Sequence, residues 1–306
     1  MKRWVTALAG GAALAAAGVV PTNAQAAGST AAAVCNIQLG SVTATGLQTS
    51  RTVIANIPPT VEPYAQGLAV FQPGQVRLSS RLTSEPGPGG DDRFAYVVIG
   101  DGLYYSGYRT TMTGGLDPEN PPGLGRIGGG WTNFTAIELA DYASYPDGRI
   151  SRTAFYGLRN DGVLFRWNVV NRGLRASGSY LGFASVKSMA LIAKTPTYDT
   201  FLANTRGGAL YTIRIPSASP MKPIVTPVRT RTWQGFETLS AMACGKNGTL
   251  LMGIDKDTKT ANLYAVGHAN GLSTVIQSRG VVPGTFDDPV YFRWAPISLF
   301  DVANGD

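Results

Sequence analysis

The sequence predicts an all-β fold, a single β-propeller of five or six four-stranded blades that follows a cleaved signal peptide. Two observations support this prediction. Hairpin patterns recur about every 50 residues, and no long segment with helical periodicity follows the N-terminal apolar run. The composition agrees, because 38 glycines and 19 prolines punctuate a chain of 306 residues that is 44% hydrophobic and only 15% charged. This balance excludes a disordered chain and favours many short strands joined by turns.

The N-terminus is predicted to be a secretory signal peptide over residues 1–26. The positive start Met1-Lys2-Arg3 is followed by an apolar run over residues 5–20 and by Ala24-Gln25-Ala26, a small-x-small cleavage pattern. The run has sixteen residues, fewer than the roughly 20 that span a bilayer, so a membrane anchor is disfavoured. The predicted location is secreted or extracellular.

The mature chain is predicted to form one domain. Residues 27–34 are small and polar, which is typical of a flexible tail, and residues 35–306 are assigned to the propeller. Cys35 to Ala55 predicts one or two strands that close the ring against the last blade. Loss of Lys2 and Arg3 leaves 24 basic and 19 acidic residues, a net charge of +5 without any block of five basic residues. The sequence therefore predicts no nucleic-acid partner and no membrane span.

Three stretches repeat one pattern, an aromatic anchor followed by two β-runs joined by a turn. The anchors Phe134, Phe183 and Phe236 lie 49 and 53 residues apart. In the first unit, residues 154–158 lead into the turn Asn160-Asp161-Gly162, and residues 163–167 return. Such a turn accepts positive φ at low cost, and the flanking runs are rich in aromatic and branched residues. Each unit therefore predicts a β-hairpin.

Fainter copies extend the repeat in both directions. One runs from Phe94 to Gly107, and a partial one covers Val290 to Trp294 and residues 297–302. A repeat of about 50 residues made of short hairpins is typical of propeller blades, and about 280 mature residues give five or six of them. A β-sandwich would lack such a repeat, and a parallel β-helix would have a much shorter one.

Several glycine- and proline-rich segments are interpreted as connections. Residues 85–92 predict a loop, and residues 216–227 predict an extended connection between blades. Asp147-Gly148, Asp161-Gly162 and Asn247-Gly248 are interpreted as plain turn residues.

The chain has two cysteines, Cys35 and Cys244. Because export would place them in an oxidising environment, where unpaired thiols are a liability, we expect them to form a disulfide. The alternative is a pair of buried free thiols.

Residues for catalysis or metal binding are scarce, and no catalytic residue, metal site or cofactor is predicted. The only histidine is His268, and the glutamates stand mostly beside proline or in turn-like contexts; they are Glu62, Glu85, Glu119, Glu138 and Glu237. The tandem acids Asp91-Asp92 and Asp287-Asp288 lie in loops. A propeller hydrolase needs two or three carboxylates at the ring centre, so a glycosidase or lyase is the least favoured function.

A Leu103-Tyr104 strand leads to a loop with Asp117 and Asn120, then to Ile127-Gly-Gly-Gly-Trp131-x-x-Phe134 and the next hairpin. Over residues 103–167 this pattern resembles the repeat of tachylectin-type β-propellers. In that family an Ile-Gly-x-Gly-Gly-Trp-x-x-Phe element opens each blade. The family's loop also carries an Asp-Asn-Trp element, and this chain lacks its tryptophan. The later blades lack the paired glycines.

The resemblance implies a lectin that binds N-acetylated sugars between neighbouring blades. It implies a site around Gly129, Gly130 and Trp131, with Asp117 and Asn120 nearby and weaker sites at Tyr180 and Trp233. A sugar ring could stack on Trp131, and paired glycines would let the backbone approach it. Trp131→Ala would then abolish glycan binding and leave the melting temperature nearly unchanged. Alternatively, Trp131 and Phe134 simply wedge between blades.

The predicted function is therefore a secreted, non-catalytic carbohydrate-binding protein for amino-sugar-containing glycans or cell-wall polysaccharide. A protein-interaction module in a secreted assembly is the alternative, because the fold alone does not select the ligand.

Overall fold

The computed structural model describes residues 34–62, 67–144, 149–296 and 302–306. The predicted signal peptide, nearly all of the predicted tail, the Asp147-Gly148 turn and most of the repeat copy over residues 297–302 lie outside these ranges. The described residues form 22 strands, nearly all in antiparallel pairs, and no helix.

Three blades are separate four-stranded sheets whose strands follow chain order. Blade 2 contains β10 (Phe134–Ser144), β11 (Arg149–Arg159), β12 (Leu164–Val170) and β13 (Gly173–Tyr180). Blade 3 contains β14 (Val186–Lys194), β15 (Tyr198–Thr205), β16 (Leu210–Pro216) and β17 (Ile224–Arg229). Blade 4 contains β18 (Thr238–Cys244), β19 (Gly248–Asp255), β20 (Thr260–Val266) and β21 (Ile276–Val281).

The remaining strands form two blades that are joined into one ten-stranded sheet. Blade 1 contains β5 (Val76–Ser79), β6 (Leu82–Gly87), β7 (Gly90–Ile99), β8 (Gly102–Arg109) and β9 (Gly123–Gly128). Blade 5 contains β22 (Val290–Pro296), β1 (Asn36–Val42), β2 (Leu47–Ile54), β3 (Thr60–Val61) and β4 (Leu68–Ala69). The parallel pairing of β22 with β6 makes the junction.

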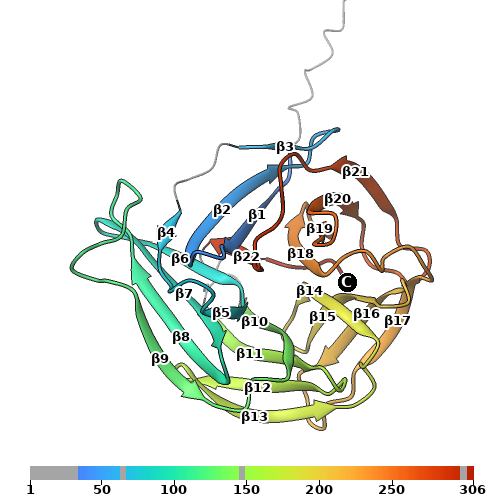
Figure 1. The fold of residues 1–306 in the computed structure, drawn as a ribbon. Coiled ribbons are helices and arrows are strands. Elements are labelled where there is room, and N and C mark those ends of the chain that lie inside the picture. The colour runs from blue at the N-terminus through green and yellow to red at the C-terminus, as the bar shows by residue number, and fades with distance from the viewer. Residues whose placement is uncertain (1–33, 63–66, 145–148, 297–301) are drawn as a thin grey trace, which may run out of the picture. The chain divides into compact units, whose positions relative to one another are not determined.

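The five blades close into a ring around a common centre (Figure 1). Their innermost strands are β5, β10, β14, β18 and β22, and each contacts the next, with β22 returning to β5. Within the described residues this is a five-bladed propeller, which confirms the predicted fold class and selects the smaller of the two blade numbers.

Hydrophobic clusters fill every interface between neighbouring blades. Five clusters of buried residues occur in the described chain, one for each pair of adjacent blades. Consecutive residues on one strand serve different clusters: Phe201 packs toward blade 2, and Leu202 packs toward blade 4. Since successive side chains of a strand point to opposite faces, the central strands are apolar on both faces. This arrangement explains the high hydrophobic content and low charge.

The three aromatic anchors lie where the sequence predicts blade openings. Phe134, Phe183 and Phe236 are buried at the start of β10 or just before β14 and β18. The predicted copy from Phe94 to Gly107 forms the β7–β8 hairpin. The repeat therefore corresponds to the blades.

Two predicted connections are wrong. Residues 85–92 are mostly strand, because β6 and β7 pair up to Gly87 and Gly90 and leave only a two-residue turn. Residues 216–227 do not link blades; they connect β16 to β17 within blade 3, and β17 continues through Pro227. Proline is tolerated there because β17 is an edge strand.

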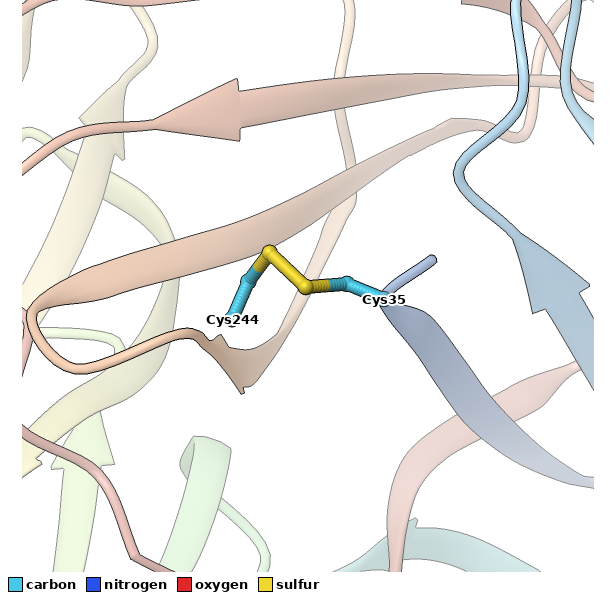
Figure 2. Close-up of a disulfide and its surroundings, with 2 residues drawn as sticks. All are labelled: Cys35 and Cys244. Carbon is cyan, nitrogen blue, oxygen red and sulfur yellow. A yellow bond between two sulfur atoms is a disulfide. The ribbon is translucent and has the colours of Figure 1, made fainter. Parts of the chain in front are cut away.

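The closing blade combines the first described strands with the last one, β22. β1 pairs with β22 in antiparallel register, with Leu39 opposite Arg293, as expected for a ring-closing N-terminal strand. Cys35, next to β1, and Cys244, at the end of β18, form a disulfide with an Sγ–Sγ distance of 2.00 Å (Figure 2). The predicted disulfide is confirmed, and it ties blade 5 to blade 4.

Candidate functional site

An open cleft of about 640 Å³ lies between blades 1 and 2. We call it the aromatic cleft; it is lined by residues 126–131 of blade 1 and by Phe134, Arg159, Phe165, Trp167, Asn171, Gly173 and Leu174 of blade 2. It therefore contains the predicted site residues Gly129, Gly130 and Trp131.

Two half-buried rings on β12 form the wall of the aromatic cleft. Phe165 and Trp167 are two residues apart, so the strand period places both on the same face. Their rings are stacked, with centroids 5.5 Å apart and an interplanar angle of 18°. Leu164 and Arg166, between and beside them, are buried on the other face. The cleft thus presents aromatic surface to a ligand.

Trp131 lies beneath this wall and is only 6% exposed. Its ring centroid is 4.4 Å from Phe134, 5.2 Å from Trp167 and 5.9 Å from Phe155. The residue therefore packs between blades while lining the cleft from below, which matches the wedge alternative for its side chain.

The glycine loop at the cleft is fixed by Asp101. The Asp101 carboxylate accepts hydrogen bonds from Gly130 N at 2.9 Å and from Thr132 Oγ1 at 2.8 Å. The hydrogen bond from Gly130, then that from Thr132, lowers the pKa of Asp101. Gly130 has φ +87°, in the region where glycine avoids steric strain. The loop is therefore held in one conformation beside the rings.

Arginines supply the charged donors of the cleft. Arg159 pairs with Asp161 through its Nε, at 2.9 Å from Oδ1, and its guanidinium lies 5.2 Å from the centroid of Phe165. Arg126 is exposed on β9. Donors next to aromatic faces suit a ligand that has both apolar faces and hydroxyl or carbonyl groups.

Asp117 and Asn120 lie in the β8–β9 loop and bond to each other. Asn120 Nδ2 donates to Asp117 Oδ2 at 2.9 Å, and this bond, with that from the Glu119 N–H, lowers the pKa of Asp117. Asn120 lines a second cleft of about 480 Å³ with Arg93, Tyr105, Tyr108, Arg109 and Arg172. These two predicted residues are therefore not among those that line the aromatic cleft.

Tyr180 and Trp233 lie elsewhere. Tyr180 is 44% exposed at the end of β13, with its ring 6.3 Å from Phe183. Trp233 is 5% exposed and packs on Phe236 and Tyr264 between blades 3 and 4. The structure brings neither of them to the aromatic cleft.

The sequence analysis did not predict the half-buried rings of the cleft, Phe165 and Trp167, or its arginines, Arg126 and Arg159. The available signal for the two rings was the alternation in residues 163–167, because it places both aromatic residues on one face of a predicted strand.

A separate cavity of about 150 Å³ lies on the propeller axis and is lined from all five innermost strands. Glu138 and Glu237, which lie far apart in the sequence, both line it. Each is ion-paired, Glu237 with Lys187 and Glu138 with Arg293. His268 is exposed at the end of blade 4. The described residues contain no cluster of three or more metal-ligating side chains.

No family model and no curated protein matches the sequence. Solved structures with a similar fold include the BP39L lectin from Burkholderia pseudomallei, at 14% identity and a TM-score of 0.41 over 80% of this chain and 69% of that one. AofleA from Arthrobotrys oligospora shares 10% identity, with a TM-score of 0.40 over 86% and 90%. The arabinofuranosidase PaAbf62A from Podospora anserina shares 12%, with a TM-score of 0.40 over 66% and 69%. Likenesses at this level concern the fold and assign no function.

Proposed function

We propose that this protein is a non-catalytic carbohydrate-binding propeller that recognises amino-sugar-containing glycans or cell-wall polysaccharide through the aromatic cleft. The observation that supports it most is the stacked pair Phe165 and Trp167 in an open inter-blade cleft. The apolar face of a sugar ring would cover these rings, and partly buried aromatic side chains dominate such contacts. The N-acetylated class follows from the tachylectin-type resemblance of residues 103–167.

Polar contacts would come from the rim of the cleft. Arg126 and Arg159 offer guanidinium donors, and the backbone at Gly129 and Gly130 can be approached closely. A ligand pocket of this kind combines an aromatic surface with a few fixed polar groups.

A glycan array that includes chitin-type and amino-sugar polymers tests the proposal. We expect the wild-type chain to bind, and Phe165→Ala to weaken binding by about tenfold, or about 1.4 kcal/mol. Tyr211→Ala is the matched control, because Tyr211 holds the equivalent half-buried position in the blade 3 repeat and does not line the cleft. Far-UV circular dichroism checks that both variants fold.

Three outcomes would contradict the proposal. No glycan hit together with a co-purifying exported protein would favour the protein-interaction module. Equal loss of binding in the two variants would move the site away from the aromatic cleft. Hydrolysis of an array ligand that stops in Glu138→Gln or Glu237→Gln would establish an enzyme with its acids in the axial cavity.

We infer further that the protein is exported. The Cys35–Cys244 disulfide supports this, because structural disulfides persist in oxidising compartments. The described part of the chain holds no helix long and apolar enough to cross a membrane. Mass spectrometry of the protein in culture medium should show a mature chain that begins at Ala27; an intact Met1 in that fraction would contradict cleavage.

A further inference from the structure

The axial cavity carries more positive than negative side chains. Its positively charged lining residues are Arg77, Lys187, Lys256 and Arg293, and its negatively charged ones are Glu138 and Glu237. The lining therefore has an excess of two positive charges. The cavity is narrow and partly enclosed. Water therefore screens this charge less than at an open surface, and its attraction for an anion is stronger.

The two carboxylates are already engaged by the protein. Glu237 accepts from Lys187 Nζ and, through its other oxygen, from the backbone N–H of Lys256 at 2.7 Å. Glu138 accepts from the Leu139 N–H at 2.9 Å and lies 3.8 Å from Arg293 Nη2. The acids thus account for two of the four cations.

Arg77 and Lys256 are held by neutral groups instead. Arg77 donates to the carbonyl oxygens of Phe134 and Trp131, and Lys256 Nζ donates to the carbonyl oxygen of Pro289 at 2.6 Å. These bonds fix the cations in place without cancelling their charge. Burial lowers the pKa of both side chains, and Asp101, Glu237 and Asp288 offset this effect only in part.

Ser240 adds a hydrogen-bond donor in the wall of the cavity. The residue is 3% exposed, and its Oγ has no hydrogen-bond partner among the described residues. A buried hydroxyl without a partner costs free energy, so a bound group that accepts its hydrogen bond would be favoured.

We propose that the axial cavity binds a small oxyanion, of the size of a phosphate or carboxylate group, attracted by Arg77 and Lys256 and hydrogen-bonded by Ser240. The cavity volume of about 150 Å³ admits such a group. This site is separate from the aromatic cleft and does not depend on carbohydrate binding.

Calorimetric titration of the full mature chain with inorganic phosphate, and separately with acetate, tests the proposal and distinguishes the two anions. Ionic strength is held constant with sodium chloride. We expect one of the anions to bind, with affinity reduced by about tenfold or more in Lys256→Gln. Lys246→Gln is the matched control, because Lys246 is exposed at the β18–β19 turn, at the other end of β19.

Two further variants keep the test decisive. Lys256→Arg keeps the charge and should retain binding, so it shows whether charge or local packing is responsible. Ser240→Ala should weaken binding by several-fold, as expected for one lost hydrogen bond. Absence of binding by both anions, or unchanged affinity in Lys256→Gln, would overturn the proposal. Glycan binding is measured on the same variants and should be unchanged.

Discussion

Trp131 and Phe165 belong to one group of aromatic rings but have different surroundings. Trp131 is enclosed by Phe134, Phe155 and Trp167, whereas Phe165 stands half-buried on the cleft wall. The paired glycines beside Trp131 made it the predicted contact for a ligand. Because Trp131 is buried, the more exposed Phe165 is the better candidate for that contact.

Trp131→Ala is expected to lower the free energy of unfolding by about 3–5 kcal/mol, because it removes a buried ring from the interface between blades 1 and 2. This replaces the expectation that the substitution leaves the melting temperature nearly unchanged. Chemical denaturation measures the effect, with the smaller loss in Phe165→Ala as reference. Unchanged stability in Trp131→Ala would show that the ring is not packed as described.

Asp101→Ala should destabilise the protein in a pH-dependent way. The pKa of Asp101 is lowered in the folded state by hydrogen bonds from Gly130 and Thr132. The charged carboxylate is therefore favoured by folding, so its contribution is fully present above the ordinary value of 3.8 and is lost as the pH falls through the lowered folded pKa. Urea denaturation at neutral and acidic pH should show the difference from wild type shrinking in acid. Asp257→Ala, at an exposed hairpin tip, should show no such trend.

At the scale of elements, the turns Trp131–Phe134 and Trp233–Phe236 each accept hydrogen bonds from one side chain of the preceding blade. Asn204 Nδ2, on β15, donates to the carbonyl oxygens of Trp233 and Phe236, both at 2.8 Å. Arg77, on β5, holds the carbonyl oxygens of Trp131 and Phe134 in the same way. The connection between blades is therefore secured by polar contacts as well as by aromatic packing.

Asn204→Ala is expected to cost about 1–3 kcal/mol of stability, because carbonyl groups of two buried residues lose their donor. Thermal and chemical denaturation measure it. Asn168→Ala, at an exposed position of β12, is the control and should be nearly neutral. A similar effect in both variants would contradict a specific role for Asn204.

Hairpins were predictable because their signals are local. The Asn160-Asp161-Gly162 turn and the aromatic anchors need only neighbouring residues to be recognised. Residues 85–92 misled because glycine and proline are common both in loops and in edge hairpins. The aromatic cleft was only half predictable: its glycine loop is a local motif, whereas the opposing wall depends on which face of β12 meets blade 1. Both faces of a propeller strand are covered, so alternation alone cannot decide this.

At the scale of the whole molecule, the ring is closed in blade 5 by two strands that lie far apart in the sequence. β1 and β22 pair through backbone hydrogen bonds, and the Cys35–Cys244 disulfide ties the same blade to blade 4. Residues 35–55 predicted the ring-closing strands and the two cysteines predicted the disulfide, although neither predicted the register.

Removal of the disulfide in a Cys35→Ser/Cys244→Ser double variant should lower the free energy of unfolding by about 2–5 kcal/mol, since the bridge closes a loop with a sequence separation of 209. Denaturation with and without a reducing agent measures the effect. Reduction should destabilise the wild-type chain and leave the double variant unaffected. A response of the variant to the reductant would contradict this assignment.

The assembly of blade 5 from distant segments also affects the order in which the protein folds. Blades 2, 3 and 4 each form from a contiguous segment, so they can assemble from nearby residues as soon as those residues are present. In blade 5, β1 can pair only after β22 is present, because Leu39 lies opposite Arg293, which is almost the full length of the chain away. Contacts between distant segments slow folding. The docking of the first strands is therefore expected to be the last step of folding, and until then their apolar faces are prone to aggregation.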